Sequence, residues 1–260
     1  MSHPKEDEIT DVVRHHWNAR AAAFDRELGH GVHSDEQEKA WLELLMRIAG
    51  PGRLKILDVG CGTGFLALLF AALGHSVTGV DLAEQMLEQA RQKADRAGLN
   101  VAFRLENGAS LNDVDQTYDL VIARHVIWTM PDPGQAVTEW MRVLKRGGQL
   151  ALIEGKWATN DPEVSRSANI TISDFGTAAL DFLRSLTWRN RRPSLLRKAY
   201  ARRYRRVEAQ LPFSGGPPAD VLVDFLKRHR LRDVVVEPLM NPALWGETPP
   251  FARYLALGRR

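Results

Sequence analysis

Cysteine is nearly absent from this sequence, because Cys61 is the only one among 260 residues. A single thiol excludes an internal disulfide framework and a multi-cysteine zinc site, and it favours a reducing compartment. Long apolar runs are also missing, since the longest, residues 65–73, is far shorter than the roughly 20 residues of a membrane-spanning helix. Residues 1–20 are charged throughout and contain no apolar signal core. We therefore expect a cytoplasmic protein with no membrane partner.

A strong excess of charge of either sign is absent as well. Lys and Arg total 35 against 32 Asp and Glu, which leaves a net charge of +3. This mild excess is compatible with an anionic substrate, but it does not by itself indicate nucleic-acid binding. Hydrophobic residues make up 44% and charged residues 26% of the chain, as in ordinary globular proteins. The composition excludes a disordered or fibrous protein, and the length fits one large domain or a domain with an insertion.

Candidate strands and helices alternate through the first part of the chain. Strand-like apolar runs fall at residues 54–59, 75–80, 100–105, 118–123 and 149–154, and helix-like segments at 65–73, 83–97 and 133–144. This alternation predicts a parallel sheet covered by helices on both faces. Near the C-terminus, a helix at 219–229 precedes strands at 233–237 and 251–257. The short, proline-containing connection between these two strands predicts an antiparallel last strand.

The same pattern divides the chain into four segments. Residues 1–50 have helical periodicity and are predicted to form helices at the N-terminus. Residues 51–154 hold the alternating core, and residues 155–217 interrupt the alternation with a polar segment that we interpret as a helical cap insertion. Residues 218–260 are predicted to complete the core sheet with a helix and strands. The predicted fold class is therefore α/β, with a doubly wound, mostly parallel sheet.

The strongest functional pattern is a glycine-rich turn after the first strand. It reads Asp58-Val59-Gly60-Cys61-Gly62-Thr63-Gly64 and opens a helix, an arrangement that lets a ligand approach the backbone closely. The next strand ends in Asp81, placed to accept hydrogen bonds from the two hydroxyls of a ribose. Dinucleotide-binding proteins use similar geometry, but a carboxylate at Asp58 would repel a pyrophosphate and the glycine spacing differs from their pattern. A nucleotide-type site for another ligand is favoured.

These residues resemble motifs I and II of class I S-adenosylmethionine-dependent methyltransferases, most closely the ubiquinone/menaquinone-type and related small-molecule methyltransferases. The resemblance covers residues 54–154. It implies a Rossmann-like methyltransferase fold with S-adenosyl-L-methionine as the cofactor. Many relatives have an Asp at the position of Asn107, which can still accept a hydrogen bond through its amide oxygen.

The resemblance also implies which residues contact the cofactor. Asp58 is expected near its amino group, Asp81 at the ribose hydroxyls and Leu82 on the adenine face. In that family an N-terminal segment folds over the cofactor as a helical lid, the role expected here for residues 1–50. Trp17, Arg20 and Phe24 are candidates for this cover, with Arg20 able to meet the cofactor carboxylate and plain helix packing as the alternative for Trp17. The complete set of expected cofactor contacts is Asp58, Gly60, Cys61, Gly62, Gly64, Asp81, Leu82, Met86, Asn107, Gly108, Ala109, Arg124, Arg20 and Trp17.

Residues for the methyl acceptor are harder to predict, because transfer from a sulfonium needs alignment and exclusion of water more than acid–base chemistry. His125 follows the fourth strand and is the candidate catalytic base, with a hydrogen-bonded structural histidine as the alternative. The candidates for substrate contact are Phe24, His33, Trp128 and Trp157. Plain packing is the alternative for Phe24 and Trp128. No metal site is predicted, since His15 and His16 are adjacent and point in different directions on a helix.

A basic stretch, residues 184–206, carries ten Lys or Arg residues and no acid. It is either a solvated helix face or a surface that attracts an anionic substrate or RNA. Nucleic acid is not the expected partner, since no appended RNA-binding module is recognisable. The motif Asn/Asp-Pro-Pro-Tyr/Phe is missing after the fourth strand, which argues against adenine-N6 and glutamine targets. We expect a methyltransferase for a small molecule, with an RNA or protein methyltransferase and a non-catalytic cofactor-binding protein as alternatives.

Overall fold

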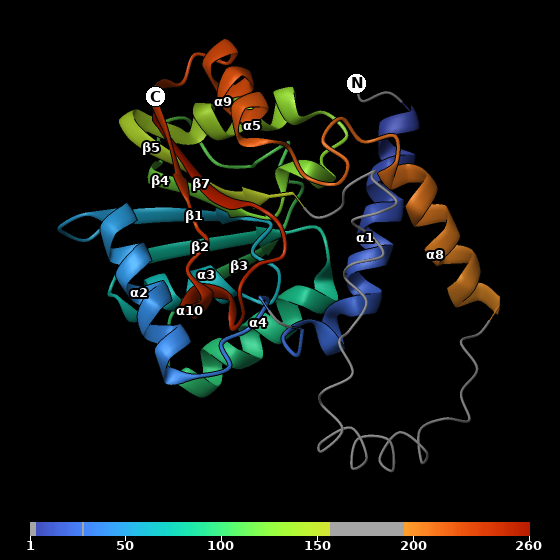
Figure 1. The fold of residues 1–260 in the computed structure, drawn as a ribbon, viewed down its shortest axis with the longest axis horizontal. Coiled ribbons are helices and arrows are strands. Elements are labelled where there is room, and N and C mark those ends of the chain that lie inside the picture. The colour runs from blue at the N-terminus through green and yellow to red at the C-terminus, as the bar shows by residue number, and fades with distance from the viewer. Residues whose placement is uncertain (1–3, 28, 157–194) are drawn as a thin grey trace.

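The computed structural model describes residues 4–27, 29–156 and 195–260, which form an α/β fold around one sheet (Figure 1). Within these residues the sheet has seven strands in the order β3-β2-β1-β4-β5-β7-β6. The strands are β1 (Lys55–Val59), β2 (Ser76–Asp81), β3 (Ala102–Leu105), β4 (Tyr118–Arg124), β5 (Leu144–Gly155), β6 (Arg232–Pro238) and β7 (Arg253–Arg259).

The strand directions agree with the sequence pattern. Strands β1 to β5 pair in parallel, whereas β7 pairs antiparallel with both β5 and β6. Ala256 of β7 lies opposite Leu152 on one side and Val236 on the other. The chain returns antiparallel because the connection from β6 to β7 is short and holds only the one-turn helix α10 (Pro242–Trp245). The predicted doubly wound, mostly parallel sheet with an antiparallel last strand is confirmed.

Helices cover both faces of the sheet (Figure 1). One face carries α2 (Asp35–Ala49), α3 (Phe65–Ala72), α4 (Glu84–Ala97) and α10, and the other carries α5 (Pro133–Val143) and α9 (Ala219–Arg228). Trp41 of α2 and Phe70 of α3 share one core with Ile122. Trp140 of α5 shares the other with Val121, because neighbouring strand residues point to opposite faces. Helix α2 therefore belongs to a layer that covers the sheet.

Helices α1 (Pro4–Phe24) and α8 (Leu195–Glu208) lie side by side at one flank of the sheet (Figure 1). Val12 and Val13 of α1 pack against Tyr204 of α8, and Ala21 of α1 packs against Met86 of α4. Helix α8 falls within the segment predicted as a cap insertion. Most of that segment, residues 157–194, lies outside the described residues.

Strand β5 begins earlier than the apolar pattern predicts. Leu144 already pairs with Tyr118, and the register shifts before Gln149 pairs with Leu120. Gly147 lies in this irregular part of the strand with a φ of 74°. Glycine weakens a strand pattern in the sequence because it is disfavoured in strands and marks bulges, so only the apolar second half was predictable.

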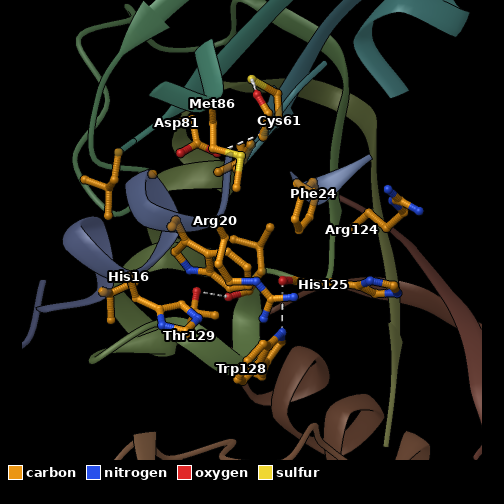
Figure 2. A pocket seen from close by; sticks show the side chains of 18 of the residues that line it. His16, Arg20, Phe24, Cys61, Asp81, Met86, Arg124, His125, Trp128 and Thr129 are labelled. Atoms are coloured by element: carbon orange, nitrogen blue, oxygen red, sulfur yellow. Dashed lines mark hydrogen bonds between the residues drawn. The ribbon is translucent and has the colours of Figure 1, made fainter. Parts of the chain in front are cut away.

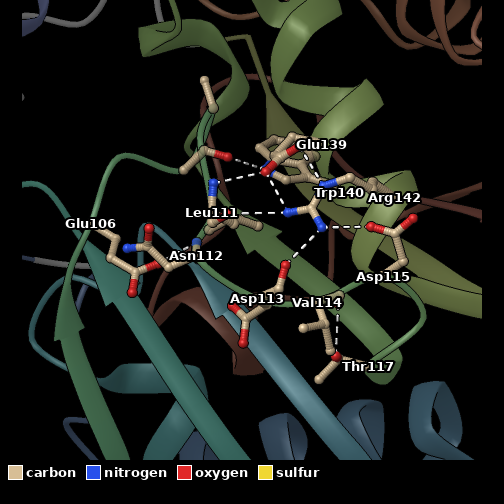
Figure 3. Close-up of polar contacts among 12 residues, drawn as sticks. Glu106, Leu111, Asn112, Asp113, Val114, Asp115, Thr117, Glu139, Trp140 and Arg142 are labelled. Atoms are coloured by element: carbon tan, nitrogen blue, oxygen red, sulfur yellow. Dashed lines mark hydrogen bonds and ion pairs between the residues drawn. The ribbon is translucent and has the colours of Figure 1, made fainter.

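The connection between β3 and β4 is held by one side chain of α5 (Figure 3). Arg142 donates hydrogen bonds to the carbonyl oxygens of Leu111 at 3.0 Å and Asp113 at 2.7 Å. The same guanidinium binds the carboxylates of Asp115 at 2.8 Å and Glu139 at 2.7 Å. Glu139 Oε1 in turn accepts a hydrogen bond from the Leu111 N–H at 2.8 Å. This network fixes a loop that begins at the edge of the cavity described below.

We expect Arg142→Met to lower the free energy of unfolding by about 2 kcal/mol, because it removes charge-assisted hydrogen bonds to two backbone carbonyls. Urea denaturation followed by circular dichroism measures the change. Arg146→Met is the matched control, since Arg146 is exposed on β5, and it should change stability by less than about 0.5 kcal/mol. Equal losses in the two variants would contradict the role of the network.

Candidate active site

A cavity of about 600 Å³ lies at the carboxyl ends of the parallel strands, between the sheet and helices α1 and α8. Figure 2 shows Cys61, Asp81 and Met86 at one end and His16 and Trp128 at the other. The predicted site residues that line it are Trp17, Arg20, Phe24, Asp58, Gly60, Cys61, Gly62, Asp81, Leu82, Met86, Asn107, Gly108, Arg124, His125 and Trp128. The structure thus brings together residues from five separate parts of the chain.

The glycine turn forms the floor of the cavity at the end of β1. Gly60 and Gly62 have φ values of 63° and 55°, in the left-handed region that favours glycine. A Cβ atom on Gly60 would overlap the side chain of Val126. Bare backbone is therefore required here, and it leaves room for a ligand to lie against the turn.

Asp81 closes this end of the cavity from β2. Its Oδ2 accepts a hydrogen bond from the Gly62 N–H at 2.8 Å, and its Oδ1 accepts one from the Ala83 N–H at 2.8 Å. Burial raises the pKa of this carboxyl to about 6, against the effect of the backbone hydrogen bonds. Asp81 is thus mainly ionised at neutral pH and can accept further hydrogen bonds from a ribose-bearing ligand.

Asp58 and Arg124 lie at the ends of the neighbouring strands β1 and β4. Asp58 is buried and accepts a hydrogen bond from the Ala67 N–H at 3.0 Å; burial raises its pKa to about 7, while Arg124 opposes the rise. The Arg124 guanidinium lies 4.0 Å from the centroid of the Phe65 ring and donates to the Gly29 carbonyl at 2.8 Å. Arg124 therefore ties the segment after α1 to the end of β4.

The turn after β3 contributes polar groups to the cavity. The side-chain oxygen of Asn107 accepts a hydrogen bond from the Ala109 N–H at 2.9 Å, and Trp140 Nε1 donates to the Gly108 carbonyl at 2.8 Å. Leu82 and Met86 supply apolar walls. These contacts hold the turn in a shape that suits the flat, polar-edged base of a nucleotide-type ligand.

Four of the predicted site residues are not among the residues found to line the cavity. Gly64 is the N-cap of α3, with a φ of 83°, and its Cα faces the Cβ of Ala90, so it serves the packing of α3 against α4. Ala109 is not part of the lining. His33 is exposed, and its ring nitrogen Nε2 lies 3.4 Å from the Glu27 carbonyl. Trp157 lies outside the described residues.

His125 is held in an unusual backbone conformation beside the cavity. Its φ is 60°, its N–H donates to the Ile153 carbonyl at 2.9 Å, and its own carbonyl accepts from Trp128 Nε1 at 2.9 Å. The imidazole stacks on Trp245, with ring centroids 5.7 Å apart. Burial and then Arg124 lower the pKa of His125 well below its usual value, so the ring is neutral at physiological pH.

Glu154 anchors the loop that carries His125, and no sequence pattern indicated this role. Its side chain is fully buried, and Oε1 accepts hydrogen bonds from the N–H groups of Val126 at 2.8 Å and Ile127 at 3.0 Å. Burial raises the pKa of Glu154 to about 8. The position could have been found from the sheet order, because β5 lies next to β4 and both strands end at the same edge.

Other lining residues were missed because they come from segments without a motif. They are chiefly His16 and His30 near α1, Tyr204, Arg205 and Glu208 of α8, and Trp245 and Arg253. Arg253 is the first residue of β7, and an antiparallel strand begins where its parallel neighbours end. That rule, applied to the predicted last strand, is the one signal that would have placed Arg253 at the site.

Two further searches cover only residues 4–27, 29–156 and 195–260. Among them, no three His, Cys, Asp or Glu side chains come together as metal ligands would. No helix in those parts of the chain has the length and apolar character needed to cross a bilayer.

Part of this chain is similar in sequence to known proteins. Residues 57–152 match a family model described as a methyltransferase domain. The ubiquinone biosynthesis O-methyltransferase of Pseudomonas fluorescens is 32% identical over 111 residues, 42% of this chain and 47% of the relative. A phosphatidylethanolamine N-methyltransferase of Cereibacter sphaeroides is 34% identical over 101 residues, 38% of this chain and 49% of the relative. The chain spans about half the length of the curated relatives it matches.

Solved structures share the fold over nearly the whole chain. The 4+2 cyclase SpnF aligns with a TM-score of 0.64 at 18% identity, covering 96% of both chains. The magnesium protoporphyrin IX methyltransferase of Synechocystis PCC 6803 aligns with a TM-score of 0.59 at 16% identity, covering 97% of this chain and 100% of that one. The sequence match thus covers the middle of the chain, and the likeness to these solved structures concerns the fold. Residues 57–152 hold the glycine turn, Asp81 and Asn107 and are the part of the chain that is similar to the methyltransferase-domain family.

We expect Glu154→Gln to remove a pH dependence of stability, because Gln keeps an acceptor oxygen for both N–H groups but does not titrate. The folded-state pKa of Glu154, about 8, lies above the ordinary value of 4.5. The folded protein therefore binds the extra proton, and the wild type loses stability relative to the variant as pH rises from about 4.5 to about 8.

Free energies of unfolding of both proteins, measured by urea denaturation at several pH values across this window, test this. Glu36→Gln is the control, since Glu36 is exposed on α2. A gap between wild type and Glu154→Gln that stays constant with pH would contradict the assignment.

Proposed function

We propose that this protein is a methyltransferase that uses S-adenosyl-L-methionine to methylate a small molecule. The observation that carries the proposal is the convergence of Asp58, Asp81 and the bare glycine turn beneath one cavity. These are the groups that a ligand with an amino group and a ribose requires, and they lie in the segment that matches the methyltransferase domain. The matching relatives, including the two named above, are methyltransferases, which supports the same activity.

The residues present fit this cofactor, which would supply an electrophilic methyl group on a sulfonium. Asp81 would accept hydrogen bonds from its ribose hydroxyls, and Asp58 would face its amino group, since both carboxyls line the cavity. Leu82 and Met86 offer apolar contact for the adenine. Arg20 lines the cavity from α1 and ion-pairs with Glu27, so its role at the cofactor carboxylate stays a proposal.

The end of the cavity opposite Asp81 is the proposed acceptor end, and its residues support a small molecule as the methyl acceptor. Trp17 and Trp128 meet edge to face, with ring centroids 6.4 Å apart, and Tyr204 of α8 adds a further aromatic wall. Of the basic stretch, Arg203 forms an ion pair with Glu8 of α1 at 2.7 Å, and Arg205 lines the cavity. These contacts favour an enclosed, anionic acceptor over RNA or protein docking. The single buried Cys61 favours the reducing cytoplasm.

His125 is our candidate for contact with the acceptor. With its lowered pKa it is a weak base, so we propose that the neutral imidazole hydrogen-bonds and orients the acceptor rather than removing a proton. Phe24 and Trp128 are proposed to exclude water from the transferred methyl group, since both line the same cavity.

Asp81→Ala should weaken binding of S-adenosyl-L-methionine by about tenfold or more, because hydrogen bonds to an ionised carboxylate are lost. Asp81→Asn should lie between the wild type and the alanine variant. Isothermal titration calorimetry measures the affinities, with Asp95→Ala on the exposed side of α4 as a control that should bind normally. Unchanged affinity in Asp81→Ala would overturn the cofactor assignment.

Methyl transfer itself is tested with methyl-labelled S-adenosyl-L-methionine and whole-cell extract, followed by separation of small molecules, protein and RNA. Label should enter the small-molecule fraction with the wild type. His125→Asn should lose at least tenfold in rate while cofactor affinity is kept, and Asn is chosen because it tolerates a positive φ. Label in RNA or protein would favour docking on the basic stretch, and no label in any fraction would favour a non-catalytic cofactor-binding protein.

A further inference from the structure

Helices α1 and α8 meet at one corner of the cavity, and each presents two polar side chains to it. His16 and Arg20, labelled in Figure 2, lie one turn apart on α1. Tyr204 and Glu208 lie one turn apart on α8 and line the same cavity. The imidazole of His16 stacks flat on the ring of Tyr204, with ring centroids 3.5 Å apart and an angle of 10°. Burial lowers the pKa of His16 to about 4, so this ring brings no charge to the corner at neutral pH.

The hydroxyl group of Tyr204 has no hydrogen-bond partner among the residues that the structure describes. Tyr204 is only 5% exposed. Val12 and Val13 pack against it and His16 stacks on its ring, and these contacts fix the orientation of the side chain. A buried hydroxyl of this kind gives up its hydrogen bonds to water and gains none in return. A ligand in the cavity that accepts a hydrogen bond from this group would recover the loss.

The hydroxyl is a donor, and the charges around it are balanced. Burial raises the pKa of Tyr204, so the proton stays on the oxygen at neutral pH. Glu208 adds to this rise and Arg20 opposes it, which places opposite charges near the hydroxyl. Arg20 in turn forms an ion pair with Glu27, and Arg205 acts on Glu208. Neither an anion nor a cation is therefore favoured here, and the group that matches the hydroxyl is an uncharged hydrogen-bond acceptor.

We propose that Tyr204 determines specificity by donating a hydrogen bond to a carbonyl oxygen of the methyl acceptor. A carbonyl oxygen has two lone pairs and no charge, as this corner requires. Trp17 meets His16 edge to face at 5.0 Å and adds an apolar wall for the body that carries the carbonyl. The carbonyl is one part of the acceptor and is compatible with an anionic group elsewhere on it. That the ligand is methylated rests on the proposed function, whereas the hydrogen bond to a carbonyl compound does not.

Two probes of matched shape, acetophenone and α-methylstyrene, test the hydrogen bond, because a methylene group replaces the carbonyl oxygen in the second. NMR chemical-shift titration of the isotope-labelled protein at neutral pH, with and without S-adenosylhomocysteine, gives the dissociation constants. Tyr204→Phe removes only the hydroxyl. It should weaken binding of acetophenone about fivefold, as expected for one hydrogen bond, and leave the affinity for α-methylstyrene unchanged or higher.

Tyr254→Phe is the matched control, because the Tyr254 hydroxyl does have a partner. It donates a hydrogen bond to the Pro217 carbonyl at 2.7 Å, and Tyr254 is not part of the cavity lining. Tyr254→Phe should therefore lower the midpoint of urea denaturation and leave both probe affinities unchanged. Tyr204→Phe should show the reverse, with weaker acetophenone binding and a denaturation midpoint that is unchanged or higher, since no hydrogen bond within the protein is lost.

Several results would overturn the carbonyl subsite. They are an unchanged acetophenone affinity in Tyr204→Phe, an equal weakening of both probes, and no saturable binding of acetophenone to the wild type up to millimolar concentration. A drop in the denaturation midpoint of Tyr204→Phe as large as that of Tyr254→Phe would also overturn it, because the hydroxyl would then have a partner within the protein. Failure of the proposed function looks different. In that case S-adenosyl-L-methionine does not bind, while acetophenone still binds in a manner that depends on the Tyr204 hydroxyl.

Discussion

The parallel pairing of β1 with both β2 and β4 is the constraint on which the site depends. Val59, the last residue of β1, lies opposite Val80 and Ala123, so Asp81 and Arg124 follow at the same edge as the glycine turn. A register slip of one residue would turn their side chains to the opposite face of the sheet. The two apolar cores fix this register, because each needs alternate residues of the same central strands.

Burial at this edge sets the charges that the cavity presents. It raises the pKa values of Asp58 and Asp81 toward neutrality and lowers those of His30 and His125. The guanidinium groups stay charged because their ordinary pKa lies so far above 7. At neutral pH the cavity therefore presents charged guanidinium groups and a mainly ionised Asp81, while the imidazoles of His30 and His125 are neutral.

The sequence predicted the sheet and many of the residues that line one end of the cavity, because both depend on local patterns. The glycine turn and Asp81 belong to strand–turn–helix units whose geometry the sequence itself determines. Tyr204 and Trp245 were missed because they reach the cavity through contacts between segments far apart in the chain, for which a single sequence carries no pattern. Glu154 was missed because it acts only through the loop that carries His125. Gly64 is the opposite case, because the motif predicted a ligand contact but the residue packs against α4.

There is a chemical reason why the residues at one end of the cavity were predictable and those at the other end were not. The glycine turn, Asp81 and Asn107 all lie within residues 57–152, the segment that matches the methyltransferase domain. At the other end, Trp128 belongs to that segment, but most of the walls come from α1, α8, α10 and the start of β7, which lie outside it. A shared cofactor requires the same local geometry in every relative, whereas each acceptor needs its own walls. On the proposed function, the residues that select the methyl acceptor are therefore to be sought among side chains such as Tyr204, Trp245 and Arg253, where the fold allows variation without disturbing the central strands.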